Sequence, residues 1–224
     1  MKITNANLIR LAGLSALIGG LCYVIVGVFH PANDPASVTT TSWATIHVIA
    51  CAMSFFGLLG LVGIYARQAV KAGWLGLVGF ILLSLWFVVV MGFTFVEAFI
   101  LPQLAATTPA LADAWMKIFN GGTSTLSLGV LPTLWTLTGF VYILGGLLFG
   151  IATFRARILP RGAGVLLALG TVLAPVGAVL SLSAQPKIAI PTGLALAWMG
   201  YALMTEHQKT PAADRNNQAA KATS

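Results

Sequence analysis

Three ionisable side chains, His30, His47 and Glu97, stand in otherwise apolar stretches of the chain. Two imidazoles and a carboxylate are a recognised ligand set for a transition metal, and histidine also ligates haem. The three residues are far apart in sequence, however, and no short spacing such as HxxxH fixes a coordination geometry. We therefore prefer a hydrogen-bonded Glu97–His47 pair, in which each group lowers the cost of burying the other. A metal or haem site made by these residues remains the alternative.

Further polar residues accompany this trio at helical spacing. Thr94 precedes Glu97 by three positions, and Tyr142 belongs to a later apolar run. A nucleophile elbow, HExxH, CxxC or phosphate loop is missing from the sequence, so we assign no catalytic residue and no cofactor. The candidate ligand-binding residues are His47, Glu97, His30, Thr94 and Tyr142.

The elements that must position these residues follow from composition. The 224 residues are 58% hydrophobic and 8% charged, with a mean hydropathy of +0.93. A soluble domain has about 25% charged residues, so most of this surface must face lipid. Long continuous apolar runs favour helices over barrel strands. The expected fold is all-α, a polytopic transmembrane bundle formed by residues 1–205, with six spans at about 9–30, 43–65, 74–101, 131–154, 162–184 and 187–204. Pro175 and Pro191 predict kinks in the last two spans.

The basic residues predict the orientation. If the N-terminus is cytoplasmic, ten of the twelve Lys and Arg residues lie on the cytoplasmic side, and only Lys117 and Lys187 lie outside. Both termini are then cytoplasmic, residues 206–224 form a disordered tail, and the protein is a multi-pass protein of the cytoplasmic membrane. The net charge of +7 is explained by contact with anionic lipid headgroups, so the bilayer is the expected partner and nucleic acid is not. A GxxxG pair, Gly146 and Gly150, permits a homo-oligomer, but helix packing within the chain explains it equally well.

One segment carries a resemblance. FRARILPRGAGVLLALG, residues 154–170, resembles a cytoplasmic turn of uncharacterised bacterial multi-span membrane proteins, with about six helices and no assigned activity. The resemblance implies a membrane bundle, and it transfers no functional residue.

The depth of the polar residues predicts the kind of function. His30, His47 and Glu97 all fall near the outer ends of their spans, whereas the inner halves carry few polar groups. We therefore expect a non-enzymatic membrane protein with an outward-facing pocket for a small ligand, a lipid or a proton, acting as a sensor, accessory subunit or minimal transporter. The alternative is a membrane-embedded redox enzyme or subunit with a metal or haem. Residues 109–119 are expected to form an amphipathic helix on the outer surface, with an Asp113–Lys117 pair.

Overall fold

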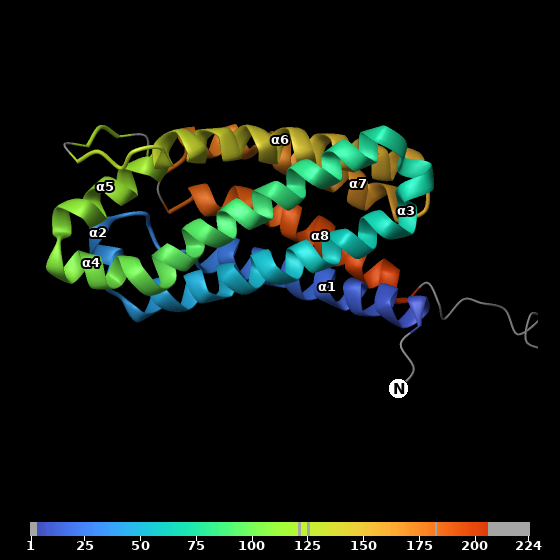
Figure 1. The fold of residues 1–224 in the computed structure, drawn as a ribbon, viewed down its shortest axis with the longest axis horizontal. Helices are drawn as coiled ribbons and strands as arrows, with labels where there is room; N and C mark the ends of the chain where they lie inside the picture. The colour runs from blue at the N-terminus through green and yellow to red at the C-terminus, as the bar shows by residue number, and fades with distance from the viewer. Residues whose placement is uncertain (1–3, 121, 125, 182, 206–224) are drawn as a thin grey trace, which may run out of the picture.

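The computed structural model describes residues 4–120, 122–124, 126–181 and 183–205. Regular secondary structure in these residues is entirely helical, which confirms the all-α prediction (Figure 1). Four helical segments are long and apolar enough to cross a membrane: Asn5–Phe29, Thr41–Thr107, Leu131–Ala156 and Gln185–Thr205. The predicted tail, residues 206–224, lies outside the described residues.

The first two long helices form the centre of the bundle. Helix α1 (Asn5–Phe29) packs against the beginning of α3 (Thr41–Phe95) and against the last helix, α8 (Ile190–Thr205). Glycines allow this approach, because a Cβ atom at Gly19 would collide with the backbone of α3 at Gly57. The helices therefore meet backbone to backbone.

Helix α3 is a hairpin rather than a rod. Gly73 has φ 57° and ψ −156°, a conformation that is essentially restricted to glycine, and it reverses the chain within one residue. We call residues 41–72 the first arm and residues 74–95 the return arm. The sequence predicted spans at 43–65 and 74–101 with a loop between them, whereas the first arm stays helical through Ala72. Residues 66–72, ARQAVKA, contain good helix formers and no glycine or proline, so nothing ends the helix earlier.

Three short helices gather at the far end of this hairpin, and we call them the cap (Figure 1). They are α2 (Pro35–Val38), α4 (Leu101–Thr107) and α5 (Pro109–Asn120). The helix predicted at residues 109–119 is confirmed, as is its Asp113–Lys117 ion pair at 2.7 Å. The cap has its own apolar cluster, which includes Trp43 and Trp115.

The C-terminal part completes the bundle with α6 (Leu131–Ala156), α7 (Arg161–Val172), the 3₁₀ helices η2 (Ala174–Val179) and η3 (Gln185–Ala189), and α8. The predicted fifth run, 162–184, is α-helical only through Val172. The predicted kinks are wrong: Pro175 lies in the first turn of η2, and Pro191 in the first turn of α8. Proline fits a first turn because the N–H it lacks has no helical partner there.

The two ends of the bundle differ. Helix α1 begins and α8 ends on the side opposite the cap, together with the Gly73 reversal and the turn between α6 and α7 (Figure 1). We call this side the terminal end. It carries most of the described basic residues: Arg10, Arg67, Lys71, Arg155, Arg157 and Arg161.

Candidate functional site

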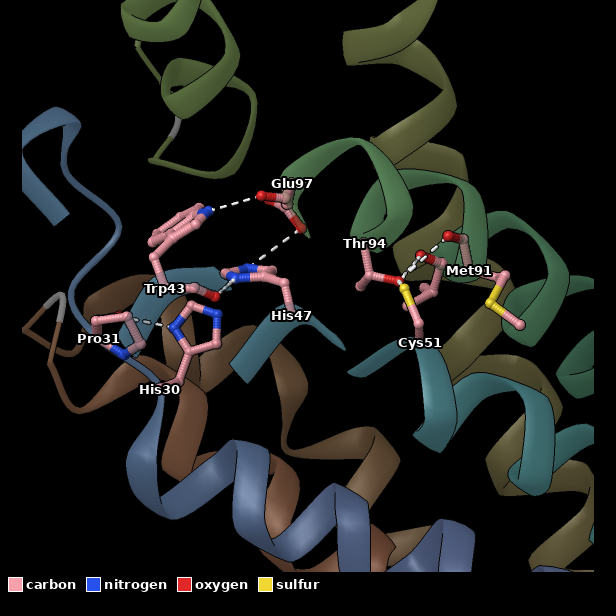
Figure 2. Close-up of polar contacts among 9 residues, drawn as sticks. His30, Pro31, Trp43, His47, Cys51, Met91, Thr94 and Glu97 are labelled. Carbon is pink, nitrogen blue, oxygen red and sulfur yellow. Dashed lines mark hydrogen bonds and ion pairs between the residues drawn. The ribbon is translucent and has the colours of Figure 1, made fainter. Parts of the chain in front are cut away.

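His47 and Glu97 face each other beneath the cap (Figure 2). His47 Nε2 lies 3.4 Å from Glu97 Oε2, and the two residues are only 2% and 5% exposed. The predicted pairing of these side chains is therefore confirmed. The antiparallel arms of α3 bring together two residues that are fifty positions apart in the sequence.

The backbone fixes the orientation of His47. Its Nδ1 atom lies 2.8 Å from the carbonyl oxygen of Trp43, one turn earlier in the first arm. A carbonyl oxygen can only accept a hydrogen bond, so Nδ1 carries a proton and donates it. Nε2, the ring atom that faces Glu97, is left as the position at which the imidazole gains or loses a proton.

A π-helical turn, η1 (Val96–Ile100), carries Glu97. The N–H of Leu101 bonds to the carbonyl oxygen of Val96, five residues back, instead of to that of Glu97. Pro102, five residues after Glu97, has no N–H to offer, so the helix leaves the Glu97 carbonyl without a donor. The indole Nε1 of Trp43 donates to this carbonyl oxygen at 2.9 Å (Figure 2). The irregular turn is thereby joined to the first arm beside the paired side chains.

Aromatic rings enclose the pair on the side of the first arm. Trp43 is fully buried, and its ring centroid lies 4.2 Å from that of His47. His30, just after α1, places its ring 4.9 Å from His47 and donates from Nδ1 to the carbonyl oxygen of Pro31 at 2.7 Å. Burial lowers the pKa of His30 below its ordinary value of 6.5.

The cap contributes Trp115 from α5. This side chain is 7% exposed and packs in the apolar cluster of the cap together with Trp43. The indole N–H of Trp115 has no hydrogen-bond partner among the residues that the structure describes. A buried donor without an acceptor costs about 1–3 kcal/mol. The cluster around Glu97 and His47 therefore contains one buried hydrogen-bond donor without an acceptor among the described residues.

Thr94 supports the cluster without touching the pair. Its hydroxyl donates to the carbonyl oxygens of Val90 and Met91 at 3.0 and 3.2 Å, and it lies 3.5 Å from the Cys51 sulfur (Figure 2). The contact with Cys51 joins the two arms one turn below Glu97.

The predicted site residue Tyr142 belongs to a different cluster from His47 and Glu97. The Tyr23 hydroxyl donates to the Tyr142 hydroxyl at 3.2 Å, and Tyr142 bonds to the Thr192 hydroxyl at 2.8 Å. Trp86 packs against both tyrosine rings, at centroid distances of 5.8 Å to Tyr23 and 4.7 Å to Tyr142. We call Tyr23, Tyr142 and Thr192 the hydroxyl cluster; it joins α1, α6 and α8 inside the bundle.

Sequence reasoning missed the two tryptophans and a buried glutamine. Trp43 and Trp115 are not among the predicted site residues, although Trp43 stands one turn before His47. Gln68 was placed in a loop, but it is buried in the first arm, and its Nε2 donates to Thr153 Oγ1 at 2.8 Å. The signal that identifies Gln68 is the helix-forming composition of residues 66–72.

The structure places His30 beside His47, and His47 beside Glu97, so the residues of the alternative metal site lie close together. Within the described residues, the structure contains no group of three or more His, Cys, Asp or Glu side chains that could hold a metal ion. Comparisons of the chain with protein-family models, curated proteins and solved structures find no match. The resemblance to uncharacterised bacterial membrane proteins stays a prediction, and function is inferred from the geometry of the site.

Proposed function

We propose that this chain is a six-pass protein of the cytoplasmic membrane that senses proton concentration through the Glu97–His47 pair, without enzymatic activity. Both termini are cytoplasmic in this proposal, and the cap faces outward. The concentration of basic residues at the terminal end supports this orientation. Helix α7 and the 3₁₀ helix η2 have about 18 and 12 Å of rise, and together they match the roughly 30 Å of a hydrocarbon core.

The carrying observation is the close approach of His47 Nε2 to the Glu97 carboxyl, at 3.4 Å, while His47 Nδ1 faces a carbonyl oxygen. Because His47 Nδ1 donates to a carbonyl, Nε2 without a proton directs a lone pair at the Glu97 carboxyl. That contact is attractive only if a proton lies between the two groups, either on Glu97 as a carboxylic acid or on His47 as an imidazolium. Loss of this proton leaves a lone pair and a carboxylate facing each other. The pair therefore couples proton binding to the contact between the two arms of α3.

Burial favours a proton over the larger ligands expected from the sequence. His47, Glu97 and Trp43 are sealed beneath α5, and their exposed surface is too small for a small molecule or a headgroup. Proton loss would repel the Glu97 turn from the first arm, and this turn leads directly into α4. The response would thus pass to the cap, where a sensor or accessory subunit meets its surroundings.

Tryptophan fluorescence tests the proposal, because a protonated imidazole quenches an indole that it stacks on and Trp43 lies against His47. Purified protein in detergent should show a reversible change in emission with pH. Glu97→Gln should remove or displace this transition, since an amide cannot share the proton. Asp113→Asn is the matched control: it neutralises an exposed carboxylate of the cap and should leave the titration unchanged. Identical titrations of wild type and Glu97→Gln would refute proton binding at this pair.

Reporter fusions test the topology separately. A reporter that is active only in the cytoplasm should be active when fused after Ser224, and a reporter that is active only outside should be active when inserted between α5 and α6. The opposite pattern would reverse the proposed orientation. If the reporters show that both positions lie on the same side of the membrane, the six-pass topology is contradicted.

A further inference from the structure

A groove runs along the outside of the bundle between the return arm of α3 and α6. It consists of two adjoining hollows of about 330 and 280 Å³, which share Val89 and Leu134 as lining residues. Apolar side chains form its walls apart from Thr138, and the Thr138 hydroxyl already donates to the carbonyl oxygen of Leu134 at 2.7 Å. The groove therefore offers an occupant apolar contact and almost no hydrogen bonding.

Gly92, an exposed glycine of the return arm, lines the hollow nearer the cap. A Cβ atom at Gly92 would meet no described atom within 4 Å, whereas one at Gly57 or Gly79 would collide with a neighbouring helix or ring. Gly57 and Gly79 thus serve helix packing, and Gly92 does not. Glycine within a helix costs about 1 kcal/mol relative to alanine. Gly92 therefore lowers the stability of the return arm without serving helix packing, and it leaves open space beside the helix.

The dimensions and surroundings of this space fit one occupant. The groove extends from Leu85 to Val96, which is eleven residue steps or about 16 Å of helix. One leaflet of a hydrocarbon core is about 15 Å thick, half of about 30 Å. Both walls belong to segments that are apolar and long enough to cross a membrane. We propose that the groove binds one acyl chain of a membrane lipid in the leaflet at the cap end.

Trp115 closes the groove at the cap. It lines the hollow nearer the cap and also belongs to the apolar cluster that contains Trp43. The lipid site goes beyond the proposed proton site and does not depend on it, although one side chain touches both. A chain seated in the groove would hold Trp115 against the Glu97 turn.

Quenching by brominated lipid tests the proposal, since bromine on an acyl chain quenches an indole only at contact. Trp86 and Trp115 line the groove and are only 8% and 7% exposed, so lipid reaches them chiefly through it. The parent protein carries Trp74→Phe and Trp198→Phe, which removes two exposed indoles at the terminal end. It is reconstituted in nanodiscs of phosphatidylcholine with brominated or ordinary acyl chains. We expect clear quenching by the brominated lipid.

Two leucine variants then separate the groove from the general lipid boundary. Gly92→Leu fills the groove and should lose most of the quenching. Gly139→Leu is the matched control, because Gly139 is an exposed helical glycine of α6 with equally open space and outside the lining of the groove. Gly139→Leu should be quenched as strongly as the parent. Glu97→Gln should also be quenched as strongly as the parent, and this result would separate lipid binding in the groove from proton binding at the Glu97–His47 pair.

Equal quenching in Gly92→Leu and the parent would overturn the proposal. So would light scattering that shows a dimer of the parent and a monomer of Gly92→Leu, since a second copy would then occupy the groove. If Gly92→Leu does not purify as a monodisperse protein, Val89→Phe fills the junction of the two hollows and gives the same two readings.

Discussion

Two buried polar clusters lie in the same bundle, and they differ in what they leave unsatisfied. In the hydroxyl cluster, Tyr23, Tyr142 and Thr192 are neutral, and the Tyr142 hydroxyl bonds to both of its partners. The Glu97–His47 cluster contains two ionisable groups and a buried indole donor without a hydrogen-bond partner among the described residues. Burial is common to both, so burial does not mark a functional site. The difference is that, in the proposed function, only the second cluster changes its contacts when a proton enters or leaves.

The largest expected effect is the removal of His47. His47→Ala leaves the Glu97 carboxyl buried without its partner, and loss of one partner from a buried pair costs about 3–5 kcal/mol of stability. Glu97→Gln should cost less, because an amide can still bond to the imidazole. The double variant should be more stable than the sum of the single effects predicts. Thermal unfolding in detergent measures the cycle, and strictly additive effects would contradict the pairing.

The hydroxyl cluster should respond differently. Tyr142→Phe leaves the hydroxyls of Tyr23 and Thr192 without their partner, and we expect a loss of about 1–3 kcal/mol. The fluorescence titration with pH should keep its wild-type midpoint, because these groups share no proton with His47. Tyr201→Phe, at an exposed position of α8, is the control and should be nearly neutral. A shifted midpoint in Tyr142→Phe would erase the distinction between the clusters.

Trp43 and Trp115 allow a comparison within the Glu97–His47 cluster. Trp43→Phe breaks the hydrogen bond to the Glu97 carbonyl, whereas Trp115→Phe removes an N–H that has no acceptor. Both changes reduce ring volume by the same amount. We therefore expect Trp43→Phe to be the more destabilising by about 1 kcal/mol in thermal unfolding. The reverse order would mean that the Trp115 N–H is satisfied.

The smallest effect should come from the ion pair on α5. Asp113 and Lys117 are 2.7 Å apart, but both are well exposed, and such i,i+4 pairs contribute about 0.2–0.5 kcal/mol. Asp113→Asn should lower the unfolding temperature slightly at low salt and not at high salt. If Asp113→Asn lost as much stability as His47→Ala, a short distance between two charges would matter more for stability than their burial in this protein.

The sequence predicts the helical class and the Glu97–His47 pair for the same reason. Apolar runs mark the helices, and antiparallel neighbours of similar length place their ends at one level. It does not predict that Gly73 alone makes the turn, because the charged residues before it are typical of a loop until their helix propensity is weighed. For the same reason, the sequence does not predict that Gln68 is buried in a helix.

Other features depend on contacts that periodicity does not encode. Tyr142 lies at a depth set by glycine-mediated packing of α6 on the return arm, where a Cβ at Gly145 would press on the backbone of Leu83. The role of Trp43 depends on the π turn, which becomes visible only when the hydrogen bond of Leu101 is traced. Helix α7 ends at Val172, three residues before Pro175, and the chain continues as η2, which packs on η3.

The one-residue reversal at Gly73 also has a consequence for biosynthesis. Both partners of the ionisable pair, and the two tryptophans and His30 around them, precede Asn120 in the chain. Their spacing is determined by a hairpin whose arms are adjacent in sequence, so the pair can assemble while α6, α7 and α8 are still being translated. The hydroxyl cluster cannot, since Thr192 belongs to α8 and emerges only after α6 and α7. The order of synthesis thus allows the titratable pair to form before the hydroxyl cluster joins the later helices to it.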